Sequence, residues 1–364
     1  MGSVRDSEDS EGRDIMRRKV AIVGLGAAAR NIHLPAYRKL PALRIVGGAD
    51  PDATESDFGF PVFESIEELL TRTEPDILTI ATPTDFHFEQ TKTALDAGCH
   101  VFCEKPFVSS LEEADAIIAL SKRVERRVVV NNEFRFMNVH AAAKDMIARP
   151  EFGELLFVAM RQTFFMTEET EAGWRGRDPR RTCKEFCTHV FDLCRFFFDE
   201  DPVRISARMP KGNDPGGPDY LNLFQLEFSG DRVAHITLDR LSRGPHRYLD
   251  IRLDGSAGCI ETSLGGRLVL CAGIRGGTRR PYAELDISMG GRARLYHSES
   301  FRRLASDPLD LFAQATGRLM GSFLAALDNG ATPPCDAEDN RRTLALMLAA
   351  YESHERGRPI EMGD

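Results

Sequence analysis

The segment VAIVGLGAAAR, residues 20–30, constrains the fold more than any other part of the chain. A short apolar run ends at Gly24, and Gly26 and Ala29 follow at the expected start of a helix. In this setting the first glycine permits a tight turn, the second lets the backbone approach a pyrophosphate, and a small third residue lets the helix pack against the strand. The helix N-terminus offers free N–H groups and a favourable dipole to phosphates. The segment therefore predicts a dinucleotide-binding unit.

Asp50 closes the next apolar run, LRIVGGAD, residues 43–50. In a dinucleotide-binding unit, a carboxylate at the end of the second strand accepts a hydrogen bond from the ribose 2′-hydroxyl of NAD. That charge would repel the extra phosphate of NADP, and no Arg or Lys follows Asp50 closely. We therefore expect NAD as the cofactor and regard NADP as less suited to the site.

Residues 18–136 alternate short apolar runs with helical segments. Near-continuous apolar strands separated by helices indicate a parallel sheet that is covered on both faces. The fold class is therefore expected to be α/β, with an N-terminal Rossmann domain over residues 18–136. Residues 1–17, which are charged and lack an apolar run, are expected to form a disordered tail.

Residues 137–364 follow a different pattern, in which strands succeed one another with turn signals between them. Leu249, Ile251 and Leu253 alternate with charged residues. This alternation indicates a strand with one face against a core and one in water. We expect a C-terminal α+β domain with an open, mostly antiparallel sheet. This domain would bind the substrate and form a homodimer or homotetramer.

The composition excludes several classes of partner. A net charge of -9 argues against a nucleic-acid surface, whose affinity comes largely from Lys and Arg. No apolar run approaches the roughly 20 residues that a membrane span needs. The N-terminus carries no apolar signal segment, and the 8 cysteines are interpreted as reduced thiols. We expect a cytoplasmic protein.

The stretch GCHVFCEKPFVSS, residues 98–110, ends an apolar strand on Glu104, Lys105 and Pro106. Open α/β sheets bind their ligands at the carboxyl ends of parallel strands. Pro106 restricts Lys105 to extended conformations and raises the chance of a cis peptide bond to about one in twenty. We interpret Lys105 as an ammonium held over the reactive end of the cofactor; the alternative is a solvated loop charge.

A second group of polar residues lies in CKEFCTHVFDLCRFF, residues 183–197. In an α-helix, Glu185, His189 and Asp192 share one face. Oxidation of an alcohol by hydride transfer also requires removal of the hydroxyl proton, and a His beside a carboxylate is a suitable base. Glu185 is expected to raise the pKa of His189 by favouring its charged form. The alternative interpretation is a solvated polar stripe.

From about Lys19 to Ile360 the chain resembles the Gfo/Idh/MocA oxidoreductases, which are named for glucose-fructose oxidoreductase, inositol dehydrogenase and a rhizopine catabolism protein. The resemblance rests on VGLGAAARNIHLPA, DILTIATPTDFHFEQTKTALDAGCHVFCEKP, THVFDLCRFF and ALMLAAYESHERGRPIEM. It implies that Lys105 contacts the substrate hydroxyl and the nicotinamide region. It also implies that His189 is the proton acceptor, and Glu185 stands where the family usually has an Asp.

The remaining expected site residues fall into two sets. Beside Gly24, Gly26, Ala29, Asp50 and Lys105, the residues expected to bind the cofactor are Thr82, Pro83, His87 and Glu104. The residues expected to contact the substrate are Arg135, Trp174, Arg175 and Asp192.

We interpret the chain as an NAD-dependent oxidoreductase that acts on a secondary alcohol of a sugar, cyclitol or related polyol. Two alternatives stay open. One is a sugar-modifying enzyme that uses bound NAD transiently, during elimination or glycoside cleavage. The other is a regulator that binds dinucleotide and sugar without turnover.

Two further sequence patterns are not interpreted as binding sites. No metal is expected, because a single helix cannot turn Cys183, Cys187, His189 and Cys194 toward one ion. The arginines at 275, 279, 280, 292 and 294 stand among glycines and are interpreted as a solvated loop, although they could bind an anion.

Overall fold

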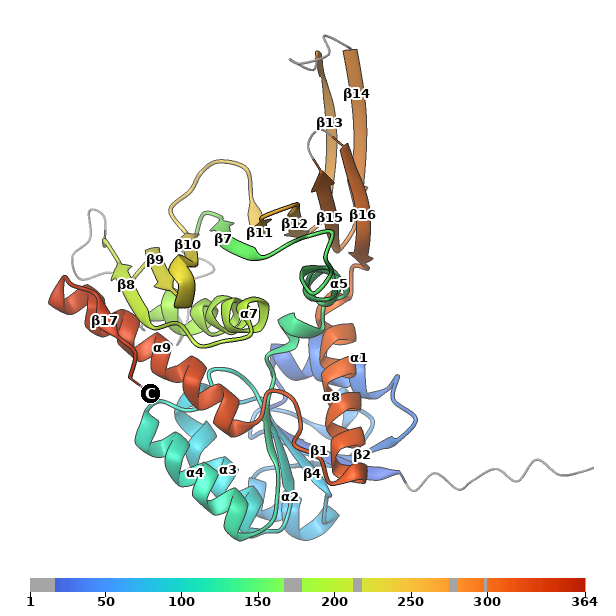
Figure 1. Ribbon diagram of the computed structural model, residues 1–364. Helices are drawn as coiled ribbons and strands as arrows, with labels where there is room; N and C mark the ends of the chain where they lie inside the picture. The colour runs from blue at the N-terminus through green and yellow to red at the C-terminus, as the bar shows by residue number, and fades with distance from the viewer. Residues whose placement is uncertain (1–16, 167–178, 212–217, 275–280, 298–299, 364) are drawn as a thin grey trace, which may run out of the picture.

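The computed structural model describes residues 17–166, 179–211, 218–274, 281–297 and 300–363 (Figure 1). The expected tail, residues 1–17, lies outside these ranges except for its last residue. Within them, a parallel sheet and a larger mixed sheet form two halves that face each other across shared helices.

The first half is the expected Rossmann domain. In the described chain its six strands are all parallel and follow the order β3-β2-β1-β4-β5-β6. The strands are β1 Arg18–Val23, β2 Leu43–Ala49, β3 Val62–Phe63, β4 Ile77–Ile80, β5 His100–Cys103 and β6 Val128–Val130. The helical segments between them are η1 Ala29–His33, α1 Leu34–Tyr37, η2 Glu55–Asp57, α2 Ile66–Thr73, η3 Thr84–Phe86, α3 His87–Asp96 and α4 Leu111–Arg123.

Local chemistry sets the ends of these helices. The hydroxyls of Ser65 and Ser110 accept the N–H groups of Glu68 and Glu113, each at 3.2 Å, so α2 and α4 start at side-chain caps. Gly98 adopts a φ of 81° just after α3, a conformation that a glycine takes at low cost. Because all six strands are parallel, their carboxyl ends lie at the same edge of the sheet.

The second sheet is mostly antiparallel, as expected. Nine described strands take the order β16-β15-β12-β11-β7-β10-β9-β8-β17, and among them only β7 and β10 pair in parallel. The strands are β7 Leu155–Thr163, β8 Arg204–Arg208, β9 Leu221–Glu227, β10 Val233–Asp239, β11 Arg247–Gly255, β12 Cys259–Leu264, β15 Gly291–His297, β16 Ser300–Asp307 and β17 Ile360–Glu361. The strands β13 Arg267–Ile274 and β14 Pro281–Ser288 form a hairpin that projects away from the sheet (Figure 1).

Helices join the two halves. The segments that follow β6 are η4 Glu133–Phe136, α5 Asn138–Ile147, η6 Cys183–Cys187, α7 Thr188–Phe198, η7 Ser229–Asp231, α8 Leu311–Asn329 and α9 Ala337–Arg356. The α8 residues Leu319, Met320 and Phe323 are fully buried in the same apolar cluster as Val20 and Ile22 of β1. Burial of each such side chain stabilises the fold by about 1.5–3 kcal/mol. The C-terminal helices therefore complete the core of the Rossmann half.

Across the described ranges, no helix combines the length and apolar character that a membrane crossing requires.

Candidate active site

A cavity of about 890 Å³ opens at the carboxyl edge of the Rossmann sheet and is closed on one side by η6. The expected site residues that line it are Gly24, Gly26, Asp50, Thr82, Pro83, Glu104, Lys105 and Glu185. The other lining residues are Val23, Ala27, Ala28, Asn31, Ile32, Ala49, Pro51, Asp52, Glu64, Ser65, Ile66, Glu67, Ala81, Thr84, Phe86, Gln90, Pro106, Arg181 and Lys184. The expected residues Ala29, His87, Arg135, His189 and Asp192 are not among the residues that line it.

The glycines of the first turn have different surroundings. Gly24 has a φ of 83°, and a Cβ there would lie 2.8 Å from the carbonyl of Ala81, so the strand-to-helix turn requires a glycine. A Cβ on Gly26 would meet nothing within 4 Å, because that position faces the cavity. Ala29 is fully buried, where a small side chain lets the helix pack on the strand. This arrangement fits a pyrophosphate seated on Gly26.

Asp50 follows β2 directly, and its carboxylate accepts hydrogen bonds from two backbone segments. One oxygen accepts the N–H of Leu25 at 2.7 Å, and the other accepts the N–H of Asp52 at 3.0 Å. Asp52, a second carboxylate close to Asp50 in the chain, also lines the cavity. This end of the cavity suits a ribose with free hydroxyls better than one that carries a phosphate.

His87 supports the cavity from behind. Its ring nitrogens face the carbonyls of Thr82, at 2.9 Å, and Pro106, also at 2.9 Å. Burial lowers the pKa of His87, although these carbonyls act in the opposite direction. The side chain thereby ties the Thr82–Pro83 segment after β4 to the turn that carries Lys105.

Lys105 follows β5, and its peptide bond to Pro106 is cis. The ammonium donates to the backbone carbonyl of Glu185 at 2.8 Å. It therefore reaches across the cavity from the Rossmann half to η6. The expected position of Lys105 at the ligand edge of the sheet agrees with this geometry.

Glu104 holds the turn in place through buried polar contacts. One carboxylate oxygen lies 2.8 Å from Nε2 of His33 and accepts from Asn131 at 2.8 Å. His33 in turn contacts the hydroxyl of Tyr37, at 3.1 Å. Burial would raise the pKa of Glu104, but His33, Lys105 and Asn131 together hold it well below its usual range. Glu104 thus presents a carboxylate on the residue before Lys105, and one of its oxygens accepts the Lys105 backbone N–H at 3.3 Å.

Glu185 contacts a cation that the sequence analysis did not identify. Its carboxylate accepts from Arg240 at 2.9 Å, and Arg240 is almost fully buried. Burial would raise the pKa of Glu185, but the guanidinium of Arg240, with Lys105 and Arg181, lowers it. The residue at the expected carboxylate position is therefore ionised and bound to a guanidinium.

His189 lies flat on Phe134, with ring centroids 3.9 Å apart and planes tilted by 10°. Burial, followed by the charge of Lys105, holds the pKa of His189 well below its ordinary value. The expected upward shift of this pKa is therefore wrong in direction: burial and Lys105 lower the pKa, and the Glu185 carboxylate accepts from Arg240. His189 is a neutral imidazole near Lys105.

Of the residues expected to share a face, His189 and Asp192 lie in α7, and Glu185 lies in the π-helical turn before it. Cys183–Cys187 is a π-helical segment, whose wider turn changes the angular position of Glu185 relative to α7. The spacing rule assumed α-helical geometry throughout. Each of the three side chains consequently contacts a different partner.

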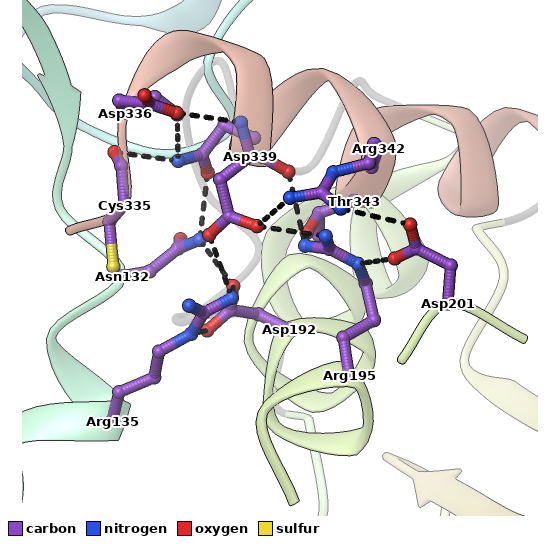
Figure 2. Close-up of polar contacts among 11 residues, drawn as sticks. Asn132, Arg135, Asp192, Arg195, Asp201, Cys335, Asp336, Asp339, Arg342 and Thr343 are labelled. Carbon is purple, nitrogen blue, oxygen red and sulfur yellow. Dashed lines mark hydrogen bonds and ion pairs between the residues drawn. The ribbon is translucent and has the colours of Figure 1, made fainter. Parts of the chain in front are cut away.

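Asp192 and Arg135 pair with each other behind the site. The guanidinium of Arg135 donates to both carboxylate oxygens, at 2.7 and 2.5 Å, and also lies 2.9 Å from Asp339 of α9. Figure 2 shows how Asn132 and Arg195 extend this group between η4, α7 and α9. The network holds the helix that carries His189 against the end of β6.

Three other expectations concerned Trp174 and Arg175, metal binding and the arginine-rich segment. Trp174 and Arg175 lie outside the described residues. In the part of the chain that the structure describes, no group of three or more His, Cys, Asp or Glu side chains is arranged to hold a metal. Arg292 and Arg294 lie in strand β15 and not in the expected loop, and the other three arginines fall outside the described ranges.

Arg240, Glu133 and Phe134 were missed by the sequence analysis. Arg240 follows the last residue of β10, and Glu133 and Phe134 follow the end of β6 by a few positions. A charged or aromatic residue just after a strand was the available signal. Their partners lie far along the chain, so the sequence gave no indication of the contacts.

Residues 18–132 match the family described as "Oxidoreductase family, NAD-binding Rossmann fold", and residues 140–261 match the "GFO/IDH/MocA C-terminal domain". The chain belongs to the Gfo/Idh/MocA family. Its matched segments contain the glycine turn, Lys105 and the helix with His189. The expected family resemblance is thereby confirmed.

Curated members of the Gfo/Idh/MocA family match nearly the whole chain. D-apiose dehydrogenase of Paraburkholderia graminis is 26% identical over 362 residues, which cover 96% of this chain and 90% of that protein. 1,5-Anhydro-D-fructose reductase of Ensifer adhaerens is 24% identical, with 85% and 86% covered. An oxidoreductase from Agrobacterium radiobacter, solved in complex with NAD+, L-tartaric acid and magnesium, has the same fold, with a TM-score of 0.78, 19% identity, and 95% and 98% covered.

Proposed function

We propose that the protein oxidises a secondary alcohol of a sugar, cyclitol or related polyol and passes the hydride to NAD. The proposal rests on one observation. The ammonium of Lys105 donates to the backbone carbonyl of Glu185 at the edge of the cavity, near the buried His189. The names of the two curated relatives, a sugar dehydrogenase and a sugar reductase, support the substrate class.

The roles follow from the chemistry of the side chains. The bound nicotinamide supplies the hydride acceptor. Lys105 donates a hydrogen bond to the reacting oxygen and stabilises the negative charge that develops on it. His189 is neutral and accepts the proton, while Glu185 and Arg240 fix the backbone to which Lys105 is bonded.

We also propose that NAD is preferred over NADP. Asp50 presents a carboxylate at the expected ribose position, with Asp52 beside it on the described cavity wall. A 2′-phosphate there would approach two carboxylate side chains. Repulsion between like charges in a partly enclosed site favours the unphosphorylated cofactor.

The proposed assembly is a homodimer or homotetramer formed through the larger sheet. Helices α5, α7 and α9 contact strands of this sheet, and Figure 1 shows them on one side of it. The side chains of Leu156 and Phe301, on described strands of the sheet, are 45% and 41% exposed. An open sheet face with apolar groups is covered in most proteins. Light scattering at micromolar concentration would show a mass above that of the monomer.

A panel of sugars, cyclitols and polyols tests the main proposal. NADH absorbance is measured with the native protein and with Lys105→Met at equal cofactor saturation. We expect net NADH formation with at least one substrate and its near loss in the variant. NAD binding without turnover on the whole panel would favour the regulator, and product formation without net NADH would favour transient use of the cofactor.

A further inference from the structure

A carboxyl group outside the proposed mechanism follows the strand next to the one that leads to Lys105. Glu133 starts η4, just after β6, and β6 pairs with β5, which leads to Lys105. Its neighbour Phe134 is the ring that stacks on His189. The first turn of η4 therefore reaches both proposed catalytic side chains.

The Glu133 side chain is buried without full hydrogen bonding. The residue is 4% exposed, and its Oε2 atom has no hydrogen-bond partner among the described residues. A buried carboxylate without partners is costly, whereas the protonated acid avoids most of that cost. The surroundings thus favour the neutral form.

The charges that face Glu133 come from several elements. Burial raises its pKa to about 8, and the carboxylates of Glu104 and Asp192 act in the same direction. The ammonium of Lys105 acts in the opposite direction. Tyr248 of β11, whose own pKa is raised by burial and by Glu133, completes the surroundings.

We propose that Glu133 is a positioning residue that holds a proton beside Lys105, and that loss of this proton lowers turnover. The proposal rests on the proposed function of Lys105. With Glu133 neutral, the ammonium donates to the Glu185 carbonyl, and its remaining N–H groups, which no described residue accepts, are available to a substrate oxygen. An ionised Glu133 would draw the ammonium toward a second carboxylate and away from that oxygen.

The pH dependence of turnover tests the proposal through Glu133→Gln, which matches the neutral acid in shape. The quantity compared is the ratio of kcat at pH 9 to kcat at pH 7 within each protein. A group with a pKa of about 8 loses roughly nine tenths of its bound proton across this range. We expect the ratio to be about tenfold higher in the variant than in the native protein. Ratios within twofold of each other would overturn the proposal.

A second measurement detects the proton on Glu133 and does not require turnover of a substrate. Between the usual Glu pKa and about 8, the folded native protein holds a proton that the unfolded chain has released, so native stability falls as pH rises. The difference in Tm between Glu133→Gln and native should therefore grow by about 2 °C or more from pH 5 to pH 8. Glu68→Gln, at an exposed position of α2, is the control and should show a constant difference. Equal pH dependence in the two variants would overturn the proposal.

The kcat and Tm measurements distinguish failure of the proposed function from failure of the Glu133 proposal. If no substrate is turned over by the native protein, the proposed function fails, while the melting data still decide whether Glu133 holds the proton. If Glu133→Gln does not fold, Glu133→Met, which also has no proton to lose, replaces it in both measurements.

Discussion

The ammonium of Lys105 donates a 2.8 Å hydrogen bond to the backbone carbonyl of Glu185, which lies 80 positions further along the chain. A carbonyl is a neutral acceptor, so this bond orients the ammonium without cancelling its charge. An ammonium has three donors, and because the described residues accept only one of them, two remain for a ligand in the cavity. The contact also fixes the spacing between β5 and η6.

Replacement of Lys105 by Met should separate binding from turnover. Met keeps the apolar stem and removes the donor to the reacting oxygen, so kcat should fall by about a hundredfold or more. The Kd of NAD should change by less than about threefold, because Gly26 and Asp50 are untouched. Lys92→Met, at an ion pair on the surface of α3, is the control. Equal losses in kcat and NAD affinity would make Lys105 a cofactor anchor.

The two glycines of the first turn provide a matched pair of variants. Gly24→Ala places a Cβ 2.8 Å from backbone atoms at a φ of 83°, so Tm should fall by several degrees. Gly26→Ala meets nothing within 4 Å, so Tm should stay unchanged while the Cβ occupies the expected pyrophosphate position. Calorimetric titration should give a loss of NAD affinity of about tenfold or more for Gly26→Ala. Native affinity in that variant would contradict the assigned phosphate site.

Asp50→Asn tests the preference for NAD. Asn keeps an oxygen that can accept the N–H of Leu25 and removes the negative charge. We expect the Kd of NADP to fall by about tenfold and that of NAD to rise a few-fold. Titration of both cofactors against native and variant proteins measures the change. Unchanged NADP affinity would show that another group excludes the phosphate.

The parts of the fold that local chemistry determines were predicted correctly. The turn at Gly24 and the position of Lys105 at the end of a strand depend on residues adjacent in sequence. The sheet classes followed from apolar patterns that extend over a few residues. Local rules are sufficient wherever the partners are close along the chain.

The partners of η6 were not predicted for the opposite reason. The contact of Glu185 with Arg240 spans 55 positions, and no local pattern indicates it. The π-helical geometry of Cys183–Cys187 was also not indicated by the sequence, which was interpreted as a regular α-helix. Long-range pairing and an irregular turn together determined this part of the site.

Asp192→Ala tests the network behind the site. The substitution removes the bidentate partner of the half-buried Arg135 guanidinium, which keeps Asp339, and should reduce the free energy of unfolding by about 1.5–3 kcal/mol. Asp115→Ala, which breaks the exposed contact with Arg341, should cost about 0–1 kcal/mol. Urea unfolding measures both. Equal effects would mean that the buried network contributes little to holding α7.

His189 provides the last prediction, because its pKa lies well below the ordinary value through burial and the charge of Lys105. The folded protein then keeps the imidazole neutral in a pH range where the unfolded chain binds a proton. Native stability should consequently fall as pH decreases below about 6.5. His189→Gln should lose less Tm than the native protein between pH 7 and pH 5, whereas His235→Gln, at an exposed position of β10, should follow the native curve.

The neutral state of His189 also determines how turnover should depend on pH and on its substitution. An imidazole that stays neutral to low pH is able to accept a proton throughout the neutral range, so native turnover should show no acid limb near pH 6.5 that belongs to this residue. His189→Ala should lower kcat by about a hundredfold or more, the range for a positioned base, at both pH 6 and pH 8. Steady-state kinetics with a substrate from the panel measures both values. A kcat near native in His189→Ala would mean that another group takes the proton.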